Sequence, residues 1–158
     1  MNDAGPGQGR IVEINLSPEY EVLPQPVERV RAVAGRGLEG DRYYRADGEP
    51  GEKPDEEITL IAVEGLEDFA EESGITVTPA ESRRQVATRG IDLNALVGRR
   101  FRVGELECEG VELCEPCNHL QGLTQPGVLK GLVHRGGLRA SILSGGEIAV
   151  GDQVSAIP

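Results

Sequence analysis

The stretch Leu138–Pro158 reads LRASILSGGEIAVGDQVSAIP, and its pattern decides the fold class. Two glycine-containing pairs, Gly145-Gly146 and Gly151-Asp152, divide it into three short segments rich in aliphatic residues. Short apolar segments between glycine turns are typical of β-strands. We therefore expect three strands, the last two paired as a final hairpin: Leu138–Leu143, Ile148–Val150 and Val154–Ile157.

The same pattern extends through most of the chain, which has 22 glycines in 158 residues. Alternating or continuous apolar runs predict six further strands: Arg10–Leu16, Val27–Val33, Ile58–Ala62, Val86–Thr88, Arg100–Val103 and Leu106–Leu113. We expect Val27–Val33 to pair with the first strand. Apolar residues at helical spacing predict one helix at Val63–Ser73, which Gly74 can end.

These elements predict a mainly β, β-rich α+β fold, a barrel or sandwich with one or two peripheral helices. We find no internal repeat and no linker, so the length fits one domain. We expect residues 1–8 to form a flexible N-terminus and residues 9–158 to form the single domain.

The charge of the chain is concentrated in one region. Lys and Arg total 16 against 27 Asp and Glu, a net charge of −11. The stretch Ala46–Glu81 has twelve acids and one base, so it carries the whole excess. From Glu81 to Arg102, by contrast, six arginines accompany two acids. An acidic surface disfavours nucleic acid and anionic membranes, yet the arginine-rich stretch can hold a small anion.

Targeting signals are not recognisable in the sequence. The N-terminus lacks the pattern of a secretory signal, and no apolar run reaches the length of a membrane helix. Three cysteines are too few for a disulfide framework. We therefore expect a cytoplasmic protein with reduced thiols, and the sequence indicates no particular oligomeric state.

The cysteines of the segment Cys114-Glu115-Pro116-Cys117 allow three interpretations. They are a redox pair, or zinc ligands together with His119 and His134, or a single reactive thiolate at Cys117. The third interpretation puts Cys117 at the start of a short helix, where unpaired N–H groups lower a thiol pKa. It leaves Cys114 as a buried strand residue and Cys108 as a core or flanking thiol.

Three Arg-Gly pairs predict an anion site: Arg36-Gly37, Arg89-Gly90 and Arg135-Gly136. Each puts a guanidinium beside backbone that a ligand can approach closely. Arg84 and Arg139 lie near two of these pairs in the sequence. Consecutive glycines at Gly136-Gly137 can present N–H groups to an anion. The alternative for each pair is an ordinary glycine turn with solvated arginine.

Six segments, taken in order, resemble the MOSC domain, the molybdenum-cofactor sulfurase C-terminal domain, over roughly Gly9 to Val154. They are Gly37–Tyr43 (GLEGDRY), Ile58–Ile61 (ITLI), Thr88–Asn94 (TRGIDLN), Leu96–Phe101 (LVGRRF), Glu112–Cys117 (ELCEPC) and His134–Arg139 (HRGGLR). The resemblance implies a β-barrel like the domain inserted in pyruvate kinase. It also implies a cysteine that carries sulfur or ligates molybdenum, and the Pro-Cys context identifies it as Cys117.

The arginine pairs and the resembling motifs together predict the residues that bind the molybdenum cofactor. These are Arg36, Asp41, Arg42, Arg84, Thr88, Arg89, Asp92, Asn94, His134, Arg135, Gly136, Gly137 and Arg139. The sequence departs from stand-alone relatives at one place. They usually have Arg-Arg-Asn before the Thr-Arg-Gly segment, whereas this chain has Arg83-Arg84-Gln85, which puts the contact of that Asn in question.

The resemblance also bears on partners. Larger sulfurases carry a pyridoxal-phosphate-dependent cysteine desulfurase domain, for which this chain is too short. A cysteine desulfurase or an electron-transfer protein is therefore a possible partner. The resemblance implies either sulfur transfer, with Cys117 as a persulfide carrier, or cofactor-dependent reduction of N-hydroxylated compounds. The alternative is a non-catalytic adaptor or sensor that binds an anion or a partner, with Ala46–Glu81 as its partner face.

Overall fold

The computed structural model describes residues 7–19, 23–41, 44, 57–114 and 136–158. Most of this part of the chain is strand. The strands are β1 (Gly7–Leu16), β2 (Gln25–Val27), β3 (Arg29–Val33), β4 (Gly37–Leu38), β5 (Ile58–Ala62), β6 (Val86–Ile91), β7 (Arg100–Val103), β8 (Leu106–Leu113), β9 (Leu138–Ser144), β10 (Gly146–Ala149) and β11 (Gln153–Ala156). The helices are α1 (Val63–Ser73), α2 (Pro79–Ser82) and the 3₁₀ helix η2 (Leu93–Leu96).

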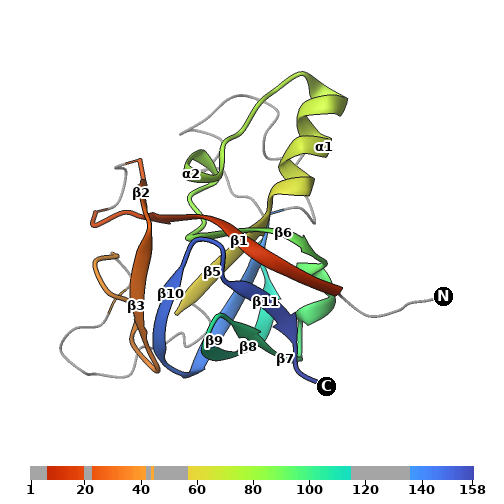
Figure 1. Cartoon of the computed structure of the whole chain (residues 1–158). Helices are drawn as coiled ribbons and strands as arrows, with labels where there is room; N and C mark the ends of the chain where they lie inside the picture. The colour runs from red at the N-terminus through yellow and green to blue at the C-terminus, as the bar shows by residue number, and fades with distance from the viewer. Residues whose placement is uncertain (1–6, 20–22, 42–43, 45–56, 115–135) are drawn as a thin grey trace.

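Seven of these strands close into a mixed β-barrel (Figure 1). Their order is β11-β7-β8-β9-β5-β6-β1, and β1 pairs with β11 to close the ring. Only β5 and β6 pair in parallel, because the chain between them crosses over through α1 and α2. The mainly β barrel with peripheral helices that the sequence predicts is therefore confirmed.

The predicted final hairpin is wrong. The penultimate strand, β10, pairs with β3, while β11 pairs with β7 and β1. The turn between them bonds to β1 instead, because Gly151 N–H donates to the Ile11 carbonyl and Ile11 N–H donates to the Asp152 carbonyl. The segment Val27–Val33, predicted to pair with the first strand, belongs to two strands. Strand β2 does pair with β1, but β3 pairs with β10 and β4.

The first strand begins earlier than the predicted Arg10. Strand β1 begins at Gly7, inside the segment 1–8 that the sequence predicts to be flexible. Residues 1–6 lie outside the described residues.

The barrel has one main core and a second, smaller cluster outside it. Ile14, Leu60 and Phe101 are fully buried in the main core. The second cluster lies under α1 and includes Ile61, Leu66 and Phe69. Leu60 and Ile61 belong to different clusters because successive side chains of a strand point to opposite faces. Strand β5 therefore holds α1 to the barrel.

The helices begin and end at recognisable residues. Helix α1 contacts β5 and β6, and α2 contacts β1 (Figure 1). Helix α1 ends as predicted at Gly74, which has a φ of 76° and donates its N–H to the Ala70 carbonyl. Helix α2 begins with a capping box, in which Thr78 and Glu81 bond to each other's backbone N–H groups. Among the described residues, no helix combines the length and apolar character needed to span a bilayer.

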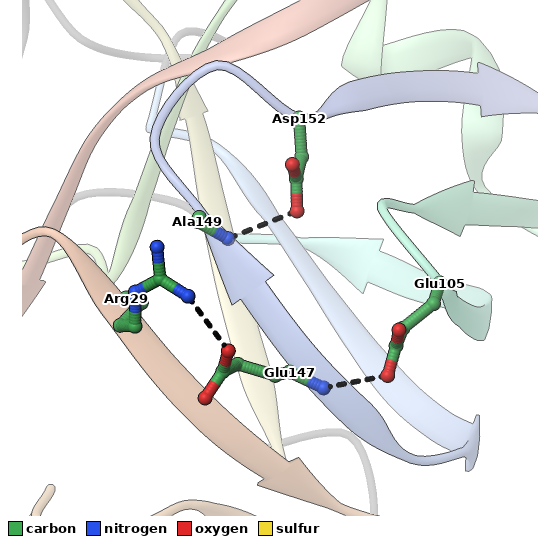
Figure 2. Close-up of polar contacts among 5 residues, drawn as sticks. All are labelled: Arg29, Glu105, Glu147, Ala149 and Asp152. Atoms are coloured by element: carbon green, nitrogen blue, oxygen red, sulfur yellow. Dashed lines mark hydrogen bonds and ion pairs between the residues drawn. The ribbon is translucent and has the colours of Figure 1, made fainter.

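Carboxylates cover the free edge of β10 in the three-stranded sheet β10-β3-β4 (Figure 2). Glu147 N–H donates to Glu105 at 2.9 Å, and Ala149 N–H donates to Asp152 at 2.9 Å. The carboxylate of Glu147 pairs with Arg29 of β3, also at 2.9 Å. The N–H groups of Glu147 and Ala149 on the free edge of β10 are therefore satisfied without a further strand. Ile148, between them, points inward and joins the barrel core.

Candidate functional site

Several predicted site residues lie outside the described residues. They are Arg42, Cys117, His134 and Arg135, together with His119 of the zinc interpretation. Among the described residues, no group of three or more His, Cys, Asp or Glu side chains is arranged to hold a metal ion. The site is therefore described from the residues that flank the segment 115–135.

Cys114 and Gly137 join the two ends of that segment. Cys114 follows β8, and its N–H donates to the Gly137 carbonyl at 2.7 Å. The side chain of Cys114 is fully buried, but it belongs to neither hydrophobic cluster. This thiol is thus enclosed at the place where the described residues on either side of 115–135 meet.

Two arginines come together beside Cys114. Arg84, just before β6, donates its Nε–H to the Gly136 carbonyl at 2.7 Å. Arg139, on β9, hydrogen-bonds the Cys114 thiol and lies 3.9 Å from a carboxylate oxygen of Glu112. Burial raises the pKa of Cys114, and the positive charges of Arg84 and Arg139 act in the opposite direction. The negative charge of Glu112 also raises this pKa, but its contribution is smaller than those of the two arginines, so the net charge felt by the thiol is positive.

Gly137 serves a packing role that the sequence analysis did not anticipate. A Cβ at this position would lie 2.1 Å from the Leu60 carbonyl oxygen, and φ is 104°. Only glycine allows the chain entering β9 to cross β5 this closely. The carbonyls of Gly136 and Gly137 accept hydrogen bonds from Arg84 and Cys114, so the glycine pair contributes acceptors that position the site.

A buried polar network fixes the backbone next to Arg84. Gln85 accepts from Thr59 N–H at 2.9 Å and donates to Asp41 at 2.8 Å. Asp41 also accepts from Ser17 N–H at 2.9 Å. All four residues are buried. The glutamine that departs from the family pattern therefore has its own partners, and Asp41 acts within this network.

Sequence reasoning missed Glu57, which it counted only as one of the twelve acids of Ala46–Glu81. Glu57 is 3% exposed, and one of its oxygens accepts from Gly35 N–H at 3.0 Å and from Ile142 N–H at 2.9 Å. It thereby ties the turn after β3 to β9. Predicted residue Arg36 lies in that turn, half-buried, and its N–H donates to the Val33 carbonyl. The available signal was an acid directly before the apolar run Ile58–Ala62.

The remaining predicted residues are on or beyond the other end of β6. Arg89 donates from both terminal nitrogens to Glu67 of α1. This pairing raises the pKa of Arg89 and lowers that of Glu67. Asp92 caps η2 by accepting from Asn94 N–H, and both of these residues are exposed.

Thr88 also lies on β6 but inside the molecule. It is fully buried, and its hydroxyl has no hydrogen-bond partner within the described part of the chain. The described residues of the predicted site are thus not all gathered at one place. Arg84, Arg139, Gly136 and Gly137 gather at Cys114, whereas Arg89 turns to α1.

The two described thiols differ in their surroundings. Both are free, and Cys108 lies in the barrel core. Burial raises the pKa of Cys108 to about 12, and the negative charges of Glu57 and Glu107 add to the effect. Cys108 is therefore an inert core thiol, and the electropositive environment is confined to the neighbourhood of Cys114.

Comparison with known proteins identifies the family. The MOSC domain model matches residues 47–155. This chain belongs to the MOSC domain family. The family is associated with the molybdenum cofactor. No curated protein matches the chain.

Solved structures share the fold of this MOSC domain. The YuaD protein from Bacillus subtilis superposes with a TM-score of 0.79 at 15% identity, covering 94% of this chain and 95% of that one. YiiM from Geobacillus stearothermophilus has a TM-score of 0.73 at 16% identity, covering 95% and 75%. YiiM from Escherichia coli has a TM-score of 0.68 at 20% identity, covering 94% and 70%. Identities this low show a common fold.

Proposed function

We propose that this MOSC domain binds the molybdenum cofactor and uses Cys117 as a sulfur carrier or as a ligand to molybdenum. The observation that carries the proposal is the meeting of Arg84 and Arg139 at Cys114. Cys117 comes three residues after Cys114 in the sequence. The cationic pair therefore surrounds the residue at which the chain enters the Cys114–Cys117 motif that the family resemblance singles out.

The described residues fit an anionic cofactor. Among the described residues, no carboxylate forms an ion pair with Arg84, whose single side-chain bond goes through Nε to a neutral carbonyl. Its terminal nitrogens, which bond to none of the described residues, would hold a phosphate by charge-assisted hydrogen bonds. Arg139 adds a second positive charge on the same side of the thiol. The cofactor, when bound, would supply a sulfur-ligated metal, for which thiolate is a suitable ligand.

Sulfur transfer to Cys117 requires a donor of one class, the persulfide of a cysteine desulfurase. The Cys117 thiolate would attack the terminal sulfur of that persulfide. A new S–S bond forms on Cys117, the S–S bond of the donor breaks, and the donor cysteine leaves as a thiolate. Nearby guanidinium groups favour this reaction because they stabilise the attacking thiolate. In cofactor-dependent reduction, the same thiolate would instead ligate the metal.

The test uses the full chain purified from a host that makes the cofactor. We expect molybdenum and pterin in equal molar amounts in the wild type, and less molybdenum in Cys117→Ser if the thiolate is a ligand. After incubation with a cysteine desulfurase and cysteine, mass spectrometry should find one added sulfur atom. The matched control Cys108→Ala should behave as wild type in both assays, because Cys108 is enclosed in the core.

Two results would contradict the proposal. One is wild-type protein that contains neither molybdenum nor pterin and takes up no sulfur. The other is a Cys117→Ser variant that equals the wild type in metal content and in sulfur uptake.

A further inference from the structure

An apolar cavity of about 310 Å³ lies between α1, β1, β6 and the segment Thr76–Pro79. It shares no lining residue with the cluster at Cys114. Its walls are mainly aliphatic and are formed by Val12, Val63, Leu66, Ala70, Val77 and Pro79. Binding pockets in proteins begin at about this size and are lined in the same way.

The cavity exists because α1 meets the barrel unevenly. Leu66 and Phe69 are buried in the cluster under the helix. Ala70, one residue further, is small and only half-buried, so it leaves space next to them. The capping box at Thr78 fixes the chain on the far side of this space. Neither wall is therefore free to collapse and fill the cavity.

The charged side chains of α1, the helix that forms one wall of the cavity, all have one sign. Helix α1 contains no basic residue, and its acids are Glu64, Glu67, Asp68, Glu71 and Glu72. Arg89 at the rim is bound by Glu67 through two hydrogen bonds. Asp68 and Glu71 are exposed on the helix. An apolar hollow thus lies directly beside an acidic helix surface.

We propose that this cavity and the exposed acids of α1 dock a basic, amphipathic segment of a partner protein. One large apolar side chain of the partner enters the cavity, whose volume equals about ten waters. Lysine or arginine side chains of the same segment meet Asp68 and Glu71. A small apolar molecule inside the cavity would leave these exposed acids without a counter-charge, and anionic lipid would be repelled by them. A peptide segment satisfies both features at once.

The test measures binding of a short fluorescent peptide made of leucine and lysine to the full chain. Two comparison peptides of equal length replace leucine by serine or lysine by glutamate. We expect the leucine–lysine peptide to bind more tightly than either, by about tenfold or more, because each comparison loses the apolar or the ionic contribution. Amide chemical shifts should change around Val12, Leu66 and Val77.

Variants separate the two contributions. Ala70→Leu fills the cavity and should weaken binding by about tenfold. The pair Asp68→Asn and Glu71→Gln lies on the surface, leaves the core intact and should remove the salt dependence of binding. Glu109→Gln, an exposed acid on β8, is the matched control and should bind as wild type. The proposal is overturned if Ala70→Leu folds and binds normally, if the serine–lysine peptide binds equally well, or if shifts appear elsewhere.

Discussion

Arg84 and Arg89 are five residues apart, one just before β6 and one near its end, and their side chains have different partners. Arg84 bonds a backbone carbonyl and contributes its charge to the surroundings of Cys114. Arg89 is matched by Glu67 and turns to α1, beside the apolar cavity. One end of the strand therefore faces the proposed cofactor site, and the other faces the proposed docking site.

The difference shows that the charge of a segment does not tell which of its arginines can bind an anion. Both residues belong to the arginine-rich stretch Glu81–Arg102. What separates them is the neighbour supplied by another element. Helix α1 brings a carboxylate to Arg89, whereas β9 brings a neutral carbonyl and a second arginine to the region of Arg84.

The largest expected effect is on the stability of the Arg84 end. Gln85→Ala leaves the Thr59 N–H and an Asp41 oxygen buried without their partner, which should cost about 3 kcal/mol of unfolding free energy. Gln85→Asn, one methylene shorter, should lose less because it can keep one of the two bonds. Denaturant titration measures both, and equal stability of all three proteins would disprove the role of the network.

The next effect concerns the two arginines directly. Arg84→Ala should lower cofactor content by about tenfold or more, since a charge-assisted bond to phosphate contributes about 1.5–3 kcal/mol. Arg89→Ala should change it little, because Glu67 already binds this guanidinium. Molybdenum and pterin analysis of the two proteins provides the comparison. A greater loss in Arg89→Ala than in Arg84→Ala would reverse our assignment.

The smallest effect at neutral pH is that of Cys108, the thiol surrounded by acids, whose burial makes stability depend on pH only in the alkaline range. Its pKa is raised to about 12 in the folded chain, so the unfolded chain loses the thiol proton first as pH rises. The contribution of this buried thiol to the unfolding free energy is complete below about pH 9. It is lost as pH rises toward 12, by up to about 1.4 kcal/mol per pH unit. Cys108→Ala should show a shallower alkaline decline in urea unfolding. An unchanged slope would contradict the burial argument.

Much of the fold could be predicted from the sequence because alternation and glycine turns are local signals. The strands at Ile58–Ala62 and Leu106–Leu113 and the helix at Val63–Ser73 have the predicted bounds. Strand partners are a different matter. The turn at Gly151-Asp152 looks like a hairpin, yet hydrogen bonds to Ile11, far away in the sequence, draw it to β1.

The site was less predictable, because burial and charge balance depend on distant residues. Asp41 and Glu57 resemble other acids in the sequence, but both are buried and each accepts two hydrogen bonds from distant parts of the chain. Arg89 resembles a ligand-binding arginine until Glu67 is placed beside it. The prediction for Cys117 stays a prediction, since this residue lies outside the described residues.

The carboxylates of Glu105 and Asp152 have a consequence for self-association. An exposed strand edge with open N–H groups is a template on which a second molecule can polymerise. Along β10 two of those groups are already bound by the molecule's own side chains. This edge is thereby closed to strand addition, which protects the small sheet against fibril growth without any change to the barrel.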